Sequence, residues 1–313
     1  MSDRTRGRAI RSLVVSGYDE FALLAENAAE YGLSFQQAPA VRRESVALPS
    51  GLELSALVWG DGSPELVLVH GGAQNAHTWD TVLLALGRPA LAVDLPGHGH
   101  SSHRPAHDYT PRSMAADVAV AVEQLAPAAA AVVGMSLGGM TAICLAANRP
   151  GLVRRLGVVD VTPGTDREKA EPIIAFVDGP ETFADFDEIL ARTIEFNPGR
   201  SEQSLRRGVL HNAYELDDGR WTWRYDRLRD WKTGEADAPD HTELWDLVGL
   251  IEAPITLWQG GRWSVVADED IAEWMRRQPT TNHMVVADAG HSIQGDRPVE
   301  LARLIDELLS VPV

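Results

Sequence analysis

The chain has 313 residues, of which 44% are apolar and 23% charged, enough for one large α/β domain or two small ones. Its net charge of −17 argues against nucleic acid as a partner, because phosphate binding needs clustered Lys and Arg side chains. A single cysteine, Cys144, excludes an internal disulfide and a CxxC metal site, and we expect neither a metal nor a cofactor.

The sequence carries no membrane or secretory signal that we recognise. Four arginines lie near the N-terminus, but the apolar stretch of a signal peptide does not follow them. No run of apolar residues reaches the length of a membrane helix. We therefore expect a cytoplasmic protein without a membrane partner.

Residues 1–40 are predicted to form an N-terminal extension that contains a helix over 19–31. Either this extension packs on the core or it mediates self-association, so a homo-oligomer remains open. Two strands, 42–48 and 52–59, follow and are joined by a Pro-Ser-Gly turn typical of a hairpin.

Beyond the hairpin, short apolar runs alternate with amphipathic segments. Strands are predicted at 66–69, 90–93, 130–133, 156–159, 255–258 and 283–286, and helices at 79–86, 113–125, 140–147, 269–277 and 299–309. This alternation predicts an α/β fold with a doubly wound, mostly parallel sheet. The core is expected over 41–162 and 251–313, and the polar, Trp-rich segment 163–250 is expected to form an inserted helical lid.

Ser136 lies between a predicted strand and a predicted helix, with Gly134 and Gly138 two residues to either side. A serine at the apex of such a turn is forced toward positive φ, and the glycines remove side chains that would collide there. The helix N-terminus directs N–H donors at the serine. The pattern therefore predicts a nucleophile elbow.

Three further polar residues, His70, Asp94 and Asp160, each follow directly after a predicted strand. In a parallel sheet these positions share the carboxyl edge, where ligands bind. His291 follows the last predicted strand and reaches the same edge. We expect the functional site there.

These segments resemble the α/β-hydrolase fold family, in particular its serine hydrolases with a helical lid, over residues 41–313. The resemblance rests on HGG (70–72), DLPGHGHS (94–101), GMSLGG (134–139) and DAGHS (288–292). It implies that Ser136 is the nucleophile and His291 its base. It also places the oxyanion hole at the N–H groups of Leu137 and Gly72, with Ala73 as the near alternative.

The acid departs from the family's common pattern. Most members place an aspartate after the penultimate strand, at Trp263 or Ser264 here, and neither is a carboxylate. Asp160 is our preferred acid, since some members use that strand end and a carboxylate there would hold the His291 tautomer. Asp268, or a neighbour at the start of the helix 269–277, and the lack of any carboxylate partner remain the alternatives.

Aromatic residues are expected to wall the substrate pocket. In the lid, alternation puts three of them on one side, where they either line the pocket or attach the lid to the core: Trp221, Trp223 and Tyr225. Near the nucleophile and the acid loop, the residues expected to shape the pocket are Met135, Trp258 and Trp263. An apolar, aromatic pocket favours a neutral, fairly hydrophobic ester or lactone.

The leading hypothesis is a serine hydrolase that cleaves a small carboxylic ester or lactone through an acyl-enzyme. A carbon–carbon bond hydrolase, which uses the same Ser, His and Asp, is the alternative within the fold. Outside enzymes, the alternative is a ligand-binding or sensor protein, which the missing acid at Trp263 or Ser264 favours.

Overall fold

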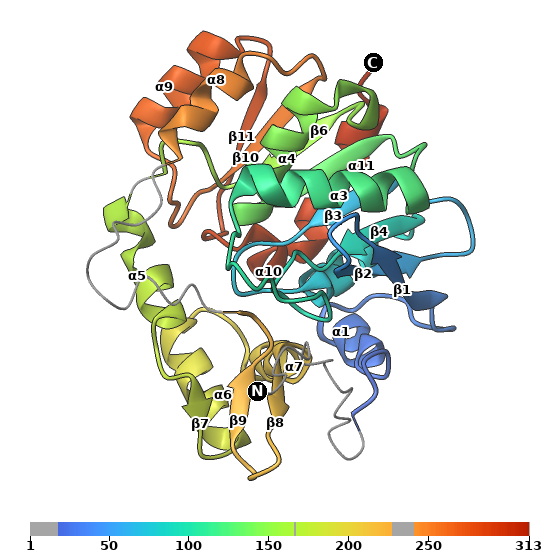
Figure 1. Ribbon diagram of the computed structural model, residues 1–313, viewed down its shortest axis with the longest axis vertical. Helices are drawn as coiled ribbons and strands as arrows, with labels where there is room; N and C mark the ends of the chain where they lie inside the picture. The colour runs from blue at the N-terminus through green and yellow to red at the C-terminus, as the bar shows by residue number, and fades with distance from the viewer. Residues whose placement is uncertain (1–17, 166, 227–240, 313) are drawn as a thin grey trace, which may run out of the picture.

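The computed structural model describes residues 18–165, 167–226 and 241–312, so residues 1–17 of the predicted extension and 227–240 of the predicted lid lie outside it. Its strands are β1 (Val41–Ala47), β2 (Glu53–Trp59), β3 (Leu66–Val69), β4 (Ala90–Val93), β5 (Ala131–Met135), β6 (Leu156–Val159), β10 (Ile255–Gly260) and β11 (Asn282–Val286). They form one eight-stranded sheet in the order β1-β2-β4-β3-β5-β6-β10-β11 (Figure 1). The pairs β1–β2 and β2–β4 are antiparallel and the remaining pairs are parallel. The expected mostly parallel α/β fold is confirmed.

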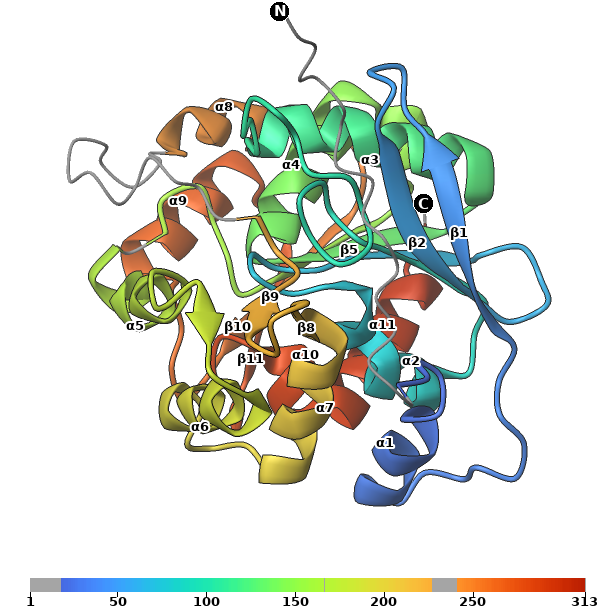
Figure 2. The same cartoon turned by 60° about the horizontal axis from the view of Figure 1, so that its bottom comes forward.

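Helices cover both faces of this sheet (Figures 1 and 2). One face packs against α3 (Pro111–Leu125), α4 (Leu137–Asn148), α8 (Trp245–Val248) and α9 (Asp268–Arg277). The other packs against α1 (Leu24–Glu30), α2 (Asp80–Leu86), α10 (Ile293–Asp296) and α11 (Pro298–Ser310). Since both faces are covered, strands β3 to β6 are buried at every position, which explains their unbroken apolar sequence.

Between β6 and β10 the chain forms a second body with a hydrophobic core of its own. It contains α5 (Arg167–Val177), α6 (Phe186–Phe196), α7 (Glu202–Asn212) and the strands β7 (Thr182–Phe183), β8 (Ala213–Glu215) and β9 (Trp221–Trp223). The three strands form an antiparallel sheet in the order β7-β9-β8, whereas the sequence analysis expected helices alone. In Figure 1 this body lies below the main sheet.

The segment after 227–240 packs differently from the second body. A turn of 3₁₀ helix, Thr242–Leu244, leads into α8, and Leu244 and Trp245 join the core cluster under α4. The hydrophobic contacts of residues 242–248 are therefore with the main sheet's helices.

The described part of the N-terminal extension packs on the core. Leu24 and Ala28 of α1 are fully buried against α2. The helix is shorter than the expected 19–31, because residues 20–23 form a turn and Gly32 at φ +64° follows its end. Among the described helices, none is both long and apolar enough to cross a membrane.

Candidate active site

Ser136 occupies the sharp turn between β5 and α4, with φ +51° and ψ −121°. A Cβ at Gly134 would lie 2.2 Å from the Gly138 carbonyl oxygen, and one at Gly138 would lie 2.3 Å from that of Val69. Both positions therefore require glycine, because any side chain there would collide with backbone atoms. Because α4 begins at Leu137, its N-terminal N–H groups surround the serine.

His291 lies in the loop between β11 and α10, and its ring contacts the carboxylate of Asp160. The Nδ1–Oδ2 distance is 2.8 Å, and 6% of His291 and none of Asp160 is exposed. Asp160 directly follows β6, which lies between β5 and β10 in the sheet. The carboxylate fixes the proton on Nδ1, so that Nε2 carries the lone pair that a base needs.

The loop after β10 holds this carboxylate in position. Asp160 Oδ1 accepts hydrogen bonds from the Gly260 N–H at 2.7 Å and the Ser264 hydroxyl at 2.6 Å. Its Oδ2 also accepts from the Val265 N–H at 3.3 Å. In most members of the family, the loop after β10 carries the catalytic aspartate itself. Here the same loop supplies hydrogen-bond donors to Asp160, which follows β6.

The sequence analysis missed this role of Ser264. It noted only that positions 263 and 264 lack a carboxylate. The sequence did contain a hint, because Ser264 puts a hydroxyl group where the family's acid is expected. A hydroxyl there can donate a hydrogen bond to a carboxylate from another strand end, as it does to Asp160.

Asp268 does not approach His291. It is exposed and begins α9, whose first turn also contains Glu269 and Asp270. Acidic side chains there stabilise the helix N-terminus. The Asp270 carboxylate also accepts a hydrogen bond from the Ala267 N–H at 3.1 Å.

Gly72 and Leu137, whose N–H groups are expected to form the oxyanion hole, are neighbours, since a Cβ at Gly72 would lie 3.8 Å from Leu137 Cδ2. Neither N–H has a hydrogen-bond acceptor within the described residues. The N–H of Ala73, the alternative, donates to His98 Nε2 at 3.1 Å.

His70 and His98 brace the loops around Gly72. His70 accepts from the Leu95 N–H at 2.9 Å and lies 2.7 Å from the Gly71 carbonyl oxygen. Burial lowers the pKa of His70, and burial together with the neighbouring His70 lowers the pKa of His98 to about 3. Both rings are therefore neutral near pH 7 and have both nitrogens engaged, so neither is a candidate for the base.

Asp94 connects the same loops to the rest of the molecule. Its Oδ1 accepts from the Ala76 N–H at 2.7 Å, and its Oδ2 pairs with Arg43 at 2.7 Å and accepts from the His100 N–H at 3.1 Å. Burial opposes the charge on Asp94, but the adjacent Arg43 guanidinium outweighs it and lowers the pKa to about 2.

The predicted pocket residues fall into two groups. Trp263 is 38% exposed, and its ring meets that of His291 edge-on at 5.8 Å. The aromatics of β9 belong to the core of the second body, where Ala73 packs against them. Tyr225 also stacks near His98, with ring centroids 6.4 Å apart.

Met135 and Trp258 differ from the expectation that they shape the pocket. Both are buried in the core cluster under α2 and α11. The Trp258 ring fills the space above Gly157, and Met135 Sδ lies beneath Gly71. Side chains alternate between the faces of a strand, and the sequence did not show which face each of these two takes.

The eight-stranded, mostly parallel sheet with helices on both faces is the fold of the α/β-hydrolase class of enzymes. A model of the alpha/beta hydrolase family matches residues 66–304, and the chain belongs to this family.

Among its relatives is the esterase Rv0045c of Mycobacterium tuberculosis, 45% identical over 302 residues, or 94% of this chain and 97% of that protein. A solved structure of that esterase, from work on its inhibition by transition metals, has a TM-score of 0.83 and matches 94% of this chain and 100% of that one. The sn-1-specific diacylglycerol lipase ABHD11 of Mus musculus is 27% identical over 81% of this chain and 84% of that protein.

The first prediction concerns the acid. We expect Asp160→Asn to lower kcat by about 10⁴, because His291 would lose the partner that fixes its tautomer. Ser264→Ala should lower kcat roughly tenfold, since one hydrogen bond to a charged group contributes about 1.5 kcal/mol. Steady-state hydrolysis of an aryl ester measures both. Asp268→Asn is the control and should retain activity; loss in this variant with activity retained in Asp160→Asn would reverse the assignment.

The second prediction concerns stability. At pH values above 3.8, the ordinary pKa of an aspartate, the lowered pKa of Asp94 adds about 2 kcal/mol to the free energy of unfolding. This contribution is lost as the pH falls through about 2. We expect Asp94→Asn to lower the free energy of unfolding by about 3 kcal/mol at pH 7, because the buried pair with Arg43 is broken and Arg43 keeps only Glu20 as its ionic partner among the described residues. The loss of stability between pH 4 and 2 should be shallower than in wild type. Urea titrations measure this, with the exposed Asp61→Asn as control; equal acid sensitivity in Asp94→Asn and wild type would contradict it.

Proposed function

We propose that this protein is a serine esterase that cleaves a small, fairly hydrophobic carboxylic ester or lactone through an acyl-enzyme. The observation that carries the proposal is the buried hydrogen bond between Asp160 and His291 on the sheet edge that also presents Ser136. An imidazole oriented by a carboxylate, on the same sheet edge as a serine at positive φ, is what nucleophilic catalysis requires.

In the proposed reaction, His291 Nε2 removes the Ser136 proton as Oγ attacks the carbonyl carbon of the ester. The N–H groups of Gly72 and Leu137 stabilise the oxyanion that forms. The imidazolium then gives its proton to the departing alkoxide, and the acyl group remains on Ser136. Water, deprotonated by the same nitrogen, attacks this acyl-enzyme, and the imidazolium returns the proton to Ser136 Oγ as the acid is released.

The placement of Asp160 also weighs against the reading of the chain as a sensor protein. That alternative depended on the missing carboxylate after β10. Asp160 contacts His291 without it, and Ser264 and the N–H groups of Gly260 and Val265 hold it there. A histidine whose tautomer is fixed by a buried carboxylate meets the requirement of a general base.

We propose that the second body acts as a lid over the site. Its strand β9 continues into Tyr225 and Asp226, and the Asp226 N–H donates to the Gly97 carbonyl oxygen at 2.6 Å. The Tyr109 hydroxyl donates to the Asp226 carboxylate at 2.6 Å. These bonds hold the aromatic core of the lid next to Ala73, in agreement with an apolar substrate.

The relatives support ester hydrolysis in general. One is an esterase and another a diacylglycerol lipase, and both of these activities break a carboxylic ester. The proposal of a lactone or an apolar ester as substrate is supported only by the aromatic residues of this chain.

The third prediction tests the nucleophile. A fluorophosphonate should label wild-type protein once per chain, and peptide mass spectrometry should find the label on Ser136. Ser136→Ala should abolish labelling and lower ester hydrolysis by at least about 10⁴, whereas Ser50→Ala, in an exposed turn, should leave both unchanged.

Failure of the folded wild-type protein to label would contradict the proposal and favour a sensor protein. With labelling established, a panel of aryl esters, lactones and dienoates identifies the reaction. Turnover of a dienoate with no turnover of esters would favour the carbon–carbon bond hydrolase instead.

A further inference from the structure

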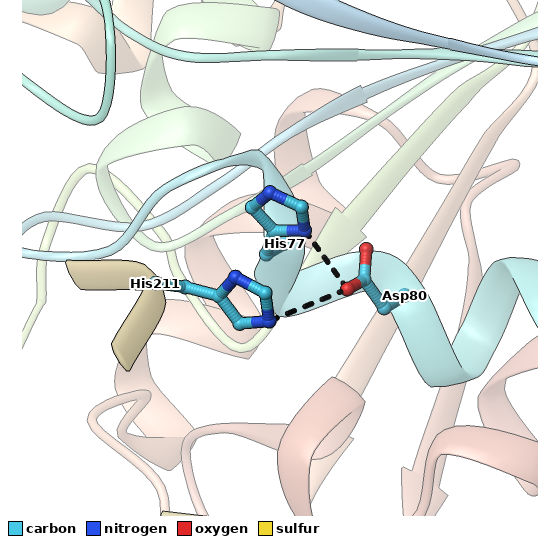
Figure 3. A group of neighbouring side chains, drawn as sticks. All are labelled: His77, Asp80 and His211. Atoms are coloured by element: carbon cyan, nitrogen blue, oxygen red, sulfur yellow. Dashed lines mark hydrogen bonds and ion pairs between the residues drawn. The ribbon is translucent and has the colours of Figure 1, made fainter. Parts of the chain in front are cut away.

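A second cluster of histidine and carboxylate lies apart from Ser136, at the junction between the main body and α7. His77 comes from a turn of 3₁₀ helix, Ala76–Trp79, Asp80 begins α2, and His211 lies near the end of α7 (Figure 3). One nitrogen of each ring and one carboxylate oxygen lie within 4.8 Å of one another. All three side chains are more than nine-tenths buried.

Both rings direct a nitrogen at the same oxygen. His77 Nδ1 lies 2.9 Å and His211 Nε2 lies 3.8 Å from Asp80 Oδ2. The rings stack at a centroid distance of 3.8 Å with an angle of 12° between their planes. Because the two planes are nearly parallel, both nitrogens point to the side on which Asp80 lies (Figure 3), and one ring must tilt before both can bind a single ion.

Two polar atoms of this cluster lack a hydrogen-bond partner among the described residues. They are His211 Nε2 and Asp80 Oδ1, both buried. Leaving a buried polar atom unpaired costs about 1–3 kcal/mol. A ligand at this point that bonds to nitrogen and carboxylate oxygen would remove that cost.

The outer nitrogens of both rings have partners of the kind that support metal ligands. His77 Nε2 lies 3.1 Å from Glu20 Oε2, and His211 Nδ1 lies 2.6 Å from the Tyr18 hydroxyl. Arg43, which is 3.3 Å from the same His77 nitrogen, is itself paired with Glu20. Carboxylates and hydrogen-bonding groups behind a ligating histidine fix the ring and its tautomer.

We propose that His77, Asp80 and His211 bind a divalent transition-metal ion of the Zn²⁺ class, with water as the fourth ligand. Two imidazole nitrogens and one carboxylate oxygen suit Zn²⁺, Co²⁺, Ni²⁺ or Cu²⁺ better than Mg²⁺ or Ca²⁺. Ligand atoms about 2.1 Å from a tetrahedral ion lie about 3.4 Å apart, so the nitrogen–oxygen distances of 2.9 and 3.8 Å each need to change by roughly half an ångström, and the stacked rings need to tilt toward the ion. The cation would replace the proton between His77 Nδ1 and Asp80, which leaves to solvent.

The cluster is reached through a cavity of about 180 Å³, which is lined by His77 and His211 and also by Ala73 and Trp223 of the expected substrate pocket. Neither Ser136, His291 nor Asp160 belongs to the cluster. An ion there would join α7 to the start of α2, and the segment before it carries Gly72.

The fourth prediction is that the full chain, stripped of metal with a chelator, binds one Zn²⁺ per chain in calorimetry. Co²⁺ in its place should give the intense visible absorption of a tetrahedral site. His211→Gln should weaken Zn²⁺ binding at least 100-fold and remove the Co²⁺ spectrum. Tyr18→Phe should weaken binding by about tenfold or more, since it removes only a partner of the ligand.

The matched control is His107→Gln, because His107 Nδ1 lies 2.9 Å from the carboxylate of Asp226 in a separate cluster. This variant should bind Zn²⁺ as wild type does. Circular dichroism of each metal-free variant establishes its folding, and Asp80→Asn replaces His211→Gln if the latter does not fold. Three results would overturn the proposal: no Zn²⁺ binding to wild type, binding as tight as wild type in His211→Gln and Asp80→Asn, or loss of binding in His107→Gln.

Discussion

The Asp160 carboxylate, buried at the end of β6, is the point on which the geometry of the candidate site depends. It receives hydrogen bonds from the loop after β10 and from His291 in the loop after β11. A buried carboxylate without such donors would be strongly destabilising, so the loops and the acid require each other. The parallel order β5-β6-β10-β11 makes this possible, since it brings the ends of these strands to one edge.

Much of the fold could be predicted because its determinants are local. The buried strands 66–69, 90–93 and 156–159 were predicted with the bounds that the structure has, since an unbroken apolar run between turns has few other interpretations. The elbow was also local: its glycines, strand and helix are adjacent in sequence, and the structure puts Ser136 at positive φ. Asp160 was preferred as the histidine's partner because it follows a strand end at which some members of the family place their acid.

Other features depend on contacts between distant residues, which one sequence does not reveal. Ser264 is informative only once Asp160, 104 residues earlier, lies beside it. Trp258 and Met135 were assigned to the pocket because they are near it in sequence, but packing of the sheet against α2 and α11 places them in the core. The same holds for His77 and His211, which fold together only because α7 packs against the start of α2.

The account rests on the claim that Asp160 holds the Nδ1 proton of His291, and proton NMR tests it most directly. A proton in a buried imidazole–carboxylate hydrogen bond is protected from exchange and resonates far downfield. We predict such a resonance in wild-type protein, its loss in Asp160→Asn, and its retention in Asp268→Asn. A spectrum that lacks this resonance in wild type, or that keeps it in Asp160→Asn, would contradict the central claim.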